Sequence, residues 1–62
     1  MSFNDSIDVC LYAIELEAER IRKAAGRRNL YEIREALGRI RTSCTEIGHS
    51  VAEKEVELWK VS

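Results

Sequence analysis

Two heptad patterns of apolar residues, separated by a short polar break, constrain this 62-residue chain more than any other feature. In the first pattern the apolar positions alternate between spacings of four and three residues; they are Ile7, Leu11, Ile14, Ala18, Ile21 and Ala25. Such spacings place side chains on one face of an α-helix. The chain contains no proline, and helix-favouring residues dominate its composition. The pattern therefore predicts a helix over about residues 4–25.

A longer heptad pattern follows the break. Its ten positions are Leu30, Ile33, Leu37, Ile40, Cys44, Ile47, Val51, Lys54, Leu58 and Val61. Only Lys54 departs from the apolar character of the pattern. Two glycines within it, Gly38 and Gly48, each weaken a helix by roughly 1 kcal/mol relative to alanine without ending it. We therefore predict a second helix over about residues 30–60.

The break itself, residues 26–29 (Gly-Arg-Arg-Asn), has the chemistry of a tight turn between helices. Gly26 can adopt the left-handed conformation that commonly ends a helix. Asn29 can cap the next helix, with Glu32 reaching back as in a capping box. The sequence thus predicts one domain over residues 1–62, an all-α antiparallel helical hairpin.

Folding at this turn brings the two apolar patterns together, with Ile21 near Ile33 and Leu11 near Cys44. We expect these patterns to form the interior of the hairpin. Other large apolar residues are left over and form the candidate protein interface; they are Val9, Tyr12, Leu16, Val56, Leu58, Trp59 and Val61. Because a chain of this length has a thin core of its own, these residues predict a homodimer, as a helical bundle, and a hetero-complex fits equally.

Charge is segregated along the chain although the net charge is only −1. Residues 20–41 hold eight basic and two acidic side chains, whereas residues 1–19 hold five acidic and no basic ones. The hairpin therefore has a basic turn and an acidic open end. Three interpretations stay open: a solvated surface, antiparallel docking of two copies, or nucleic-acid binding at the turn. The candidate nucleic-acid contacts are Arg27, Arg28, Tyr31 and Arg34.

The sequence offers little chemistry for catalysis or for cofactor or metal binding. His49 is the single histidine and falls on the solvent side of the second helix, so we expect no catalytic residues and no cofactor. Cys10 and Cys44 fall in neighbouring layers, where a disulfide is conceivable, but two buried reduced thiols are favoured. A zinc site from both cysteines and His49 lacks a fourth ligand and a standard spacing, so we expect no metal.

Two stretches, SFNDSIDVCLY at residues 2–12 and AAGRRNL at residues 24–30, resemble the small helical early accessory proteins of lambdoid phages. These proteins are encoded between the exonuclease and excisionase genes. The resemblance implies an early role that shifts host physiology or the lysis–lysogeny balance through contacts with host factors. It supplies no catalytic or binding residues.

We therefore expect a non-enzymatic protein that self-associates and binds a host protein. The alternative is a nucleic-acid-binding hairpin, because the length and helix count also resemble those of Rop-type RNA-binding dimers. No apolar run approaches the roughly 18 residues of a membrane span, and no signal peptide opens the chain. The expected location is the cytoplasm, that of the host cell for a phage-encoded protein.

Overall fold

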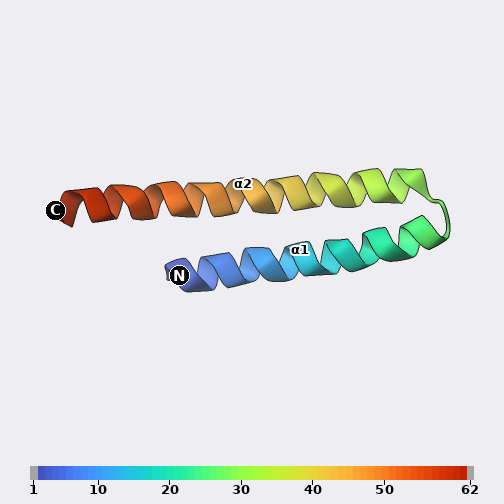
Figure 1. Cartoon of the computed structure of the whole chain (residues 1–62), viewed down its shortest axis with the longest axis horizontal. Coiled ribbons are helices and arrows are strands. Elements are labelled where there is room, and N and C mark those ends of the chain that lie inside the picture. Colours follow the sequence, from blue (N-terminus) through green and yellow to red (C-terminus); the bar gives the residue numbers. More distant parts are fainter. Residues whose placement is uncertain (1, 62) are drawn as a thin grey trace.

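The computed structural model of the protein describes residues 2–61, and the side chains of residues 2–60. Two helices, α1 (Phe3–Gly26) and α2 (Leu30–Val61), lie antiparallel and side by side (Figure 1). The molecule measures 52 × 16 × 13 Å. The last turns of α2 extend beyond the N-terminal end of α1 (Figure 1). The all-α antiparallel hairpin is confirmed, and the predicted helix limits agree to within one residue.

A serine cap starts α1. The backbone N–H of Asp5 donates to Ser2 Oγ at 3.2 Å, which satisfies one of the amides that the first helical turn leaves without a partner. The carboxylate of Asp5 also lies in this first turn, where the helix dipole favours negative charge. The chain before the apolar pattern is therefore chemically suited to begin the helix at Phe3.

The turn differs from the sequence prediction at one residue. The left-handed conformation belongs to Arg28, with φ of 55°, and no glycine among the described residues has a positive φ. The N–H of Asn29 donates to the carbonyl of Ala24 at 2.9 Å, and the N–H of Arg28 to that of Ala25 at 3.1 Å. This pair of bonds is a Schellman motif, in which the left-handed residue lies two positions beyond Gly26. The prediction that Gly26 takes this conformation was wrong.

The cap of α2 is the predicted one. Asn29 Oδ1 accepts a hydrogen bond from the backbone N–H of Glu32 at 3.1 Å. In return, Asn29 Nδ2 donates to Glu32 Oε2 at 3.2 Å. The reciprocal contact thus joins the two side chains. In a capping box the Glu side chain would instead accept from the backbone N–H of the cap residue, here Asn29. Arg27 Nη2, 2.8 Å from the same Glu32 oxygen, ties the turn to the first turn of α2.

The most deeply buried residues between the helices are small or polar, and the heptad isoleucines are half-buried. We call the five buried residues the inner strip: Cys10, Glu17 and Ala24 on α1, and Ala36 and Ser43 on α2. Ala24 and Ala36 are fully buried, at 0% exposure. Their small side chains let the two backbones approach closely. The expectation that the apolar patterns form the hairpin interior was therefore right only in part: the heptad isoleucines are half-buried, whereas the other heptad positions are exposed on one side of the contact.

Candidate interaction surface

Most of the heptad residues gather on one broad side of the hairpin, which we call the seam face. It is formed by the heptad positions Ile7 to Ala25 of α1 and Leu30 to Val51 of α2. Five exposed heptad positions each follow a buried residue by one position; they are Leu11, Ala18, Ala25, Leu37 and Cys44. A step of one residue rotates a side chain by about 100°, which moves it from the contact to its edge.

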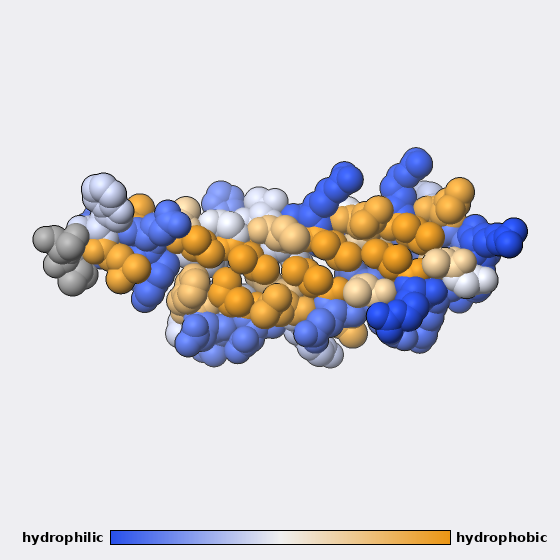
Figure 2. Space-filling view, in the orientation of Figure 1, coloured by the Kyte–Doolittle hydropathy of each residue, from blue (hydrophilic) through white to orange (hydrophobic). Residues whose placement is uncertain are grey.

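Seven of the thirteen seam-face positions are exposed to solvent, and the other six, all isoleucines, are half-buried. The exposed fraction is 45% for Leu11, 42% for Leu37 and 38% for Val51, and it reaches 75% for Leu30 beside the turn. Figure 2 shows the apolar band running along both helices for most of the length of the hairpin. A groove beside the turn is lined by apolar side chains and bordered by arginines; its residues are Leu30, Ile33, Arg34, Glu35, Leu37, Gly38 and Arg41. Contiguous apolar surface of this kind marks a site of protein interaction.

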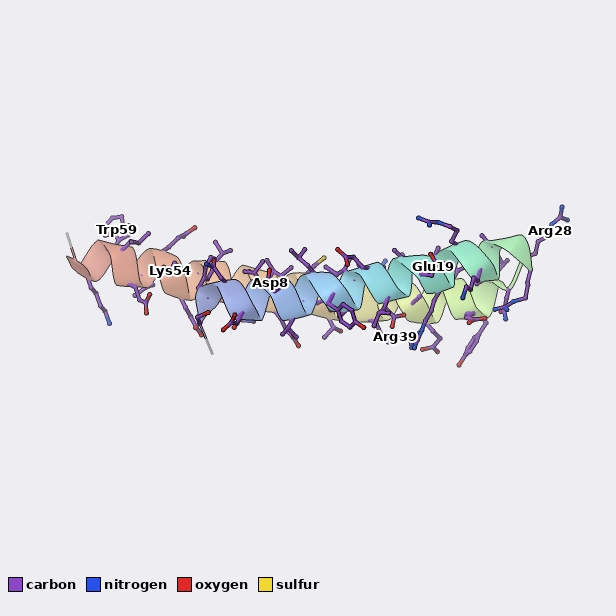
Figure 3. The ribbon with its side chains drawn as sticks, turned by 90° about the horizontal axis from the view of Figure 1, so that it is seen from below. Asp8, Glu19, Arg28, Arg39, Lys54 and Trp59 are labelled. Carbon is purple, nitrogen blue, oxygen red and sulfur yellow. The ribbon has the colours of Figure 1, made fainter. Side chains whose placement is uncertain are left out.

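The other side of the hairpin is held together by charge. Arg39 Nε on α2 lies 2.9 Å from Glu17 Oε2 on α1, and Arg20 Nη1 lies 3.3 Å from Glu17 Oε1. Figure 3 shows Arg39 on the opposite side of the hairpin from Trp59. Cys10 Sγ donates to Glu46 Oε2 at 3.5 Å, also between the helices. The interhelical polar contacts therefore fix which sides of the two helices meet.

Glu17 is the buried charge of this arrangement. Its side chain is 10% exposed, and that of Arg39 is 46% exposed. The Oε2 atom is buried and has no hydrogen bond of good geometry within the described chain, so the close guanidinium compensates it through charge alone. A carboxylate in this position lowers the stability of the fold if its counter-ion is removed, because burial removes most of its hydration.

The residues predicted from the leftover apolar positions of α1 are exposed as expected. The exposed fraction is 56% for Val9, 64% for Tyr12 and 47% for Leu16. By helical periodicity they lie away from the seam face, beyond the side that carries Glu17. They form a smaller apolar group than the seam face, because acidic residues such as Glu19 alternate with them.

The end of α2 carries the second predicted group. The exposed fraction is 53% for Val56, 61% for Leu58 and 82% for Trp59. Val61, also predicted as a contact, lies outside the residues whose side chains are described. Lys54, the polar member of the heptad pattern, places its Nζ 6.0 Å from the centre of the Phe3 ring. This cation–π contact joins α2 to the first residue of α1. The part of α2 that follows Lys54 extends beyond the N-terminal end of α1 (Figure 1).

The four residues predicted to contact nucleic acid lie at the turn, and two of them have local partners. Arg27 is paired with Glu32, as described above. Tyr31 is 74% exposed. Its hydrogen bond to the Glu35 carboxylate, followed by the charge of that group, raises the pKa of the Tyr31 hydroxyl. Arg28 and Arg34 are exposed. The turn is therefore basic, but its aromatic side chain lies beside an acid, Glu35.

The two cysteines occupy different environments, and both are free thiols. Cys10 is buried in the inner strip, and this burial, followed by its bond to Glu46, raises the pKa of the thiol. Cys44 is exposed on the seam face, which corrects the expectation that both thiols are buried. His49 is exposed, at the place predicted for it.

Two negative observations apply to the described part of the chain. Within residues 2–61, no three His, Cys, Asp or Glu side chains come together in a metal-binding arrangement. Neither helix, as far as its residues are described, is long and apolar enough to cross a membrane.

Reasoning from sequence missed two features of the surface. It did not identify the seam face as exposed, although the heptads that form it were plain. It also missed the ion pair of Glu17 and Arg39. A signal for both was present: Cys10, Glu17 and Ala24 recur every seven residues, which is the spacing of a second strip along the same helix.

The chain matches no protein-family model, no curated relative and no solved structure.

Proposed function

We propose that the protein is a non-enzymatic interaction protein that self-associates and, in the assembled form, contacts a host protein. The seam face carries the first part of this proposal. Leucines and valines at 38% to 75% exposure along a helical surface cost free energy in water, and covering them by another protein surface recovers it.

The second part rests on the exposed apolar side chains that self-association through the seam face would not cover. Val9, Tyr12 and Leu16 lie away from that face, and Val56 and Trp59 lie beyond the N-terminal end of α1. Aromatic residues are enriched where proteins bind most tightly. The resemblance to early accessory proteins of lambdoid phages supports a host protein as the partner and a change in host physiology or the lysis–lysogeny balance as the outcome.

The self-association is tested by sedimentation equilibrium over a range of concentrations. We expect a mass of about twice 7.1 kDa at micromolar concentration, and a monomer for Leu37→Lys, which places a charge in the middle of the seam face. Leu16→Lys is the matched control, because Leu16 and Leu37 are similarly exposed. A wild-type protein that is helical but monomeric at every concentration would refute this part of the proposal.

The host contact is tested separately, with Trp59→Ala and Tyr12→Ala proteins that still assemble. We expect these variants to lose a host protein that the wild type retains after nuclease treatment. Retention by both variants would exclude these side chains as the contact.

Nucleic-acid binding through the turn is the second candidate, and the exposed Arg28 and Arg34 favour it. It predicts affinity that falls steeply with salt, because bound arginines release counter-ions from phosphates. An Arg28→Ala/Arg34→Ala variant should then lose binding to both RNA and DNA. Binding equal to that of the wild type would remove this candidate.

A further inference from the structure

We propose that the seam face is covered by a second copy of this chain whose turn lies at the opposite end, so that two hairpins form an antiparallel four-helix bundle. This inference rests on the proposed self-association and adds the direction in which the second copy lies. The observations that carry it are the size of the exposed face, the spacing of its residues and the distribution of charge along the hairpin.

The size of the seam face suits a partner of the same length. The 24 residues of α1 span about 36 Å at 1.5 Å per residue, and the molecule is 16 Å wide. The flat area of the face, length times width, is therefore about 600 Å², and its accessible surface is larger because the side chains protrude. A standard protein interface buries about 800 Å² of accessible surface on each partner. A second hairpin covers the whole face, whereas a single helix covers only about half of its width.

The spacing of the seam residues is self-complementary. On α1 the intervals from Ile7 to Ala25 are four, three, four, three and four residues, which read the same in both directions. A two-fold axis beside residue 16 therefore sets Ile7 against Ala25 of the second copy, and Leu11 against its Ile21. Because the helices are antiparallel and Glu17 contacts Arg39, residue 16 of α1 lies level with about residue 40 of α2. The same axis therefore passes near residue 40. Heptad positions then meet in layers on both pairs of helices, as a helical bundle requires.

The distribution of charge selects the direction. Residues 17–39, the half nearer the turn, carry seven basic and four acidic side chains. Residues 2–15 and 41–60, the open half, carry three basic and seven acidic ones. Turns at opposite ends place each basic half over an acidic half, whereas turns at the same end stack like charges. Opposite ends are therefore favoured.

Side chains at the borders of the face largely agree with this direction. Asp8 borders the seam face on α1 and comes opposite Arg22 of the second copy. Glu15 and Arg41 lie beside the axis and meet their own counterparts, which opposes the arrangement. Both are exposed, so water and salt screen these two contacts. The excess of opposite charge over the two halves outweighs them.

Distances between spin labels on the two copies test the direction. The labels are attached at Gly26→Cys and Asn4→Cys, in a chain with Cys10→Ala and Cys44→Ala whose dimerisation is first verified. Both positions are exposed, and a side chain added at Gly26 meets no other atom within 4 Å. We expect about 30 Å between two labels at position 26, because each lies ten residues from the axis. A label at position 26 of one copy and one at position 4 of the other should lie within about 15 Å.

Each outcome has a distinct meaning. Like labels separated by about 30 Å, with unlike labels close together, support the antiparallel bundle. Like labels closer than about 20 Å, with unlike labels far apart, overturn the inference and leave the self-association intact. A monomer that shows no distance between copies refutes the proposed function together with the inference.

Salt gives an independent readout on the unmodified protein. Raising NaCl from about 50 to 500 mM screens the attraction between basic and acidic halves. We expect the dimer dissociation constant to rise severalfold. A constant that falls with salt indicates like charges in contact and contradicts the opposite direction of the two turns.

Discussion

The inner strip and the seam face run along the same two helices, and they differ in almost every physical property. The inner strip is narrow, buried and made of alanine, serine, cysteine and one ion-paired glutamate. The seam face is broad and mostly apolar, with exposed leucines and Val51 alternating with half-buried isoleucines. The inner strip thus contains few large apolar side chains, and several leucines are exposed beside it. The proposed second copy would bury these leucines and add hydrophobic stabilisation to the hairpin.

The largest expected effect separates the seam face from the far side of α1. Leu37→Ala should lower the free energy of unfolding by about 3 kcal/mol at concentrations where the protein is assembled, because it leaves a cavity in a covered core. Leu16→Ala should change it by less than about 0.5 kcal/mol, although the two leucines are similarly exposed in the single hairpin. Urea denaturation followed by circular dichroism measures both. Equal losses would abolish the distinction between the two surfaces.

The second prediction concerns the close approach of the helices at the inner strip. Ala36→Leu should lower the free energy of unfolding by about 2 kcal/mol, because a fully buried alanine leaves no room for a larger side chain. Ala52→Leu is the control, since Ala52 is exposed. A stabilised Ala36→Leu protein would show that the inner strip is loosely packed, contrary to the structure.

A smaller effect is expected at the buried ion pair. Arg39→Ala should destabilise the hairpin by about 1 kcal/mol, because Glu17 then keeps a buried charge without its interhelical counter-ion. Arg22→Ala removes the pair of Arg22 with Glu19, whose nitrogen–oxygen distance is 3.3 Å and whose side chains are 79% and 53% exposed, and should cost only about 0.3 kcal/mol. Thermal melts at low salt measure the difference. If Glu17→Gln restores the stability of Arg39→Ala, the uncompensated charge is the cause.

Alkylation of the two cysteines compares the inner strip, which contains Cys10, with the seam face, which contains Cys44, and it needs no substitution. At pH 8 and high protein concentration, alkylation of both thiols should be slow, because Cys10 is buried within the hairpin and the proposed second copy would cover Cys44. Dilution below the dissociation constant of the dimer should raise the alkylation rate of Cys44 by about tenfold. The alkylation rate of Cys10 should stay low, because the raised pKa of its thiol also lowers the fraction of reactive thiolate. Mass spectrometry of the alkylated protein distinguishes the two sites. Cys44 reacting at the same rate at all concentrations would argue against a covered seam face.

The smallest predicted effect is on the pH dependence of stability. The pKa of Cys10 is higher in the folded chain than its ordinary value of 9.0. Its contribution to the free energy of unfolding is therefore fully present below pH 9 and is lost as the pH rises through the folded pKa. Cys10→Ala should show a shallower decline between pH 8 and pH 10 in urea denaturation. Tyr31, whose pKa is also raised, titrates in both proteins and provides the common background.

The sequence predicted the fold well because its signals are local. A heptad pattern, the absence of proline and the caps at Ser2 and Asn29 act within a few residues, so they determine the two helices and the turn between them. The turn was predicted with one error, since Arg28 rather than Gly26 adopts the left-handed conformation. Local chemistry permits a left-handed residue at either position. The hydrogen bonds to Ala24 and Ala25 decide which of them takes it.

The rotation of each helix about its own axis was not determined by the sequence pattern. Apolar periodicity shows which residues share a face, but it does not show what that face contacts. In this molecule the close approach of Ala24 and Ala36, together with the interhelical ion pair of Glu17 and Arg39, turns the heptad residues to one side of the contact. The sequence by itself therefore determined two helices of unequal length and their antiparallel course. Only the tertiary structure decided that the leucines of these apolar faces lie outward, because that depends on which side chains let the two backbones come close.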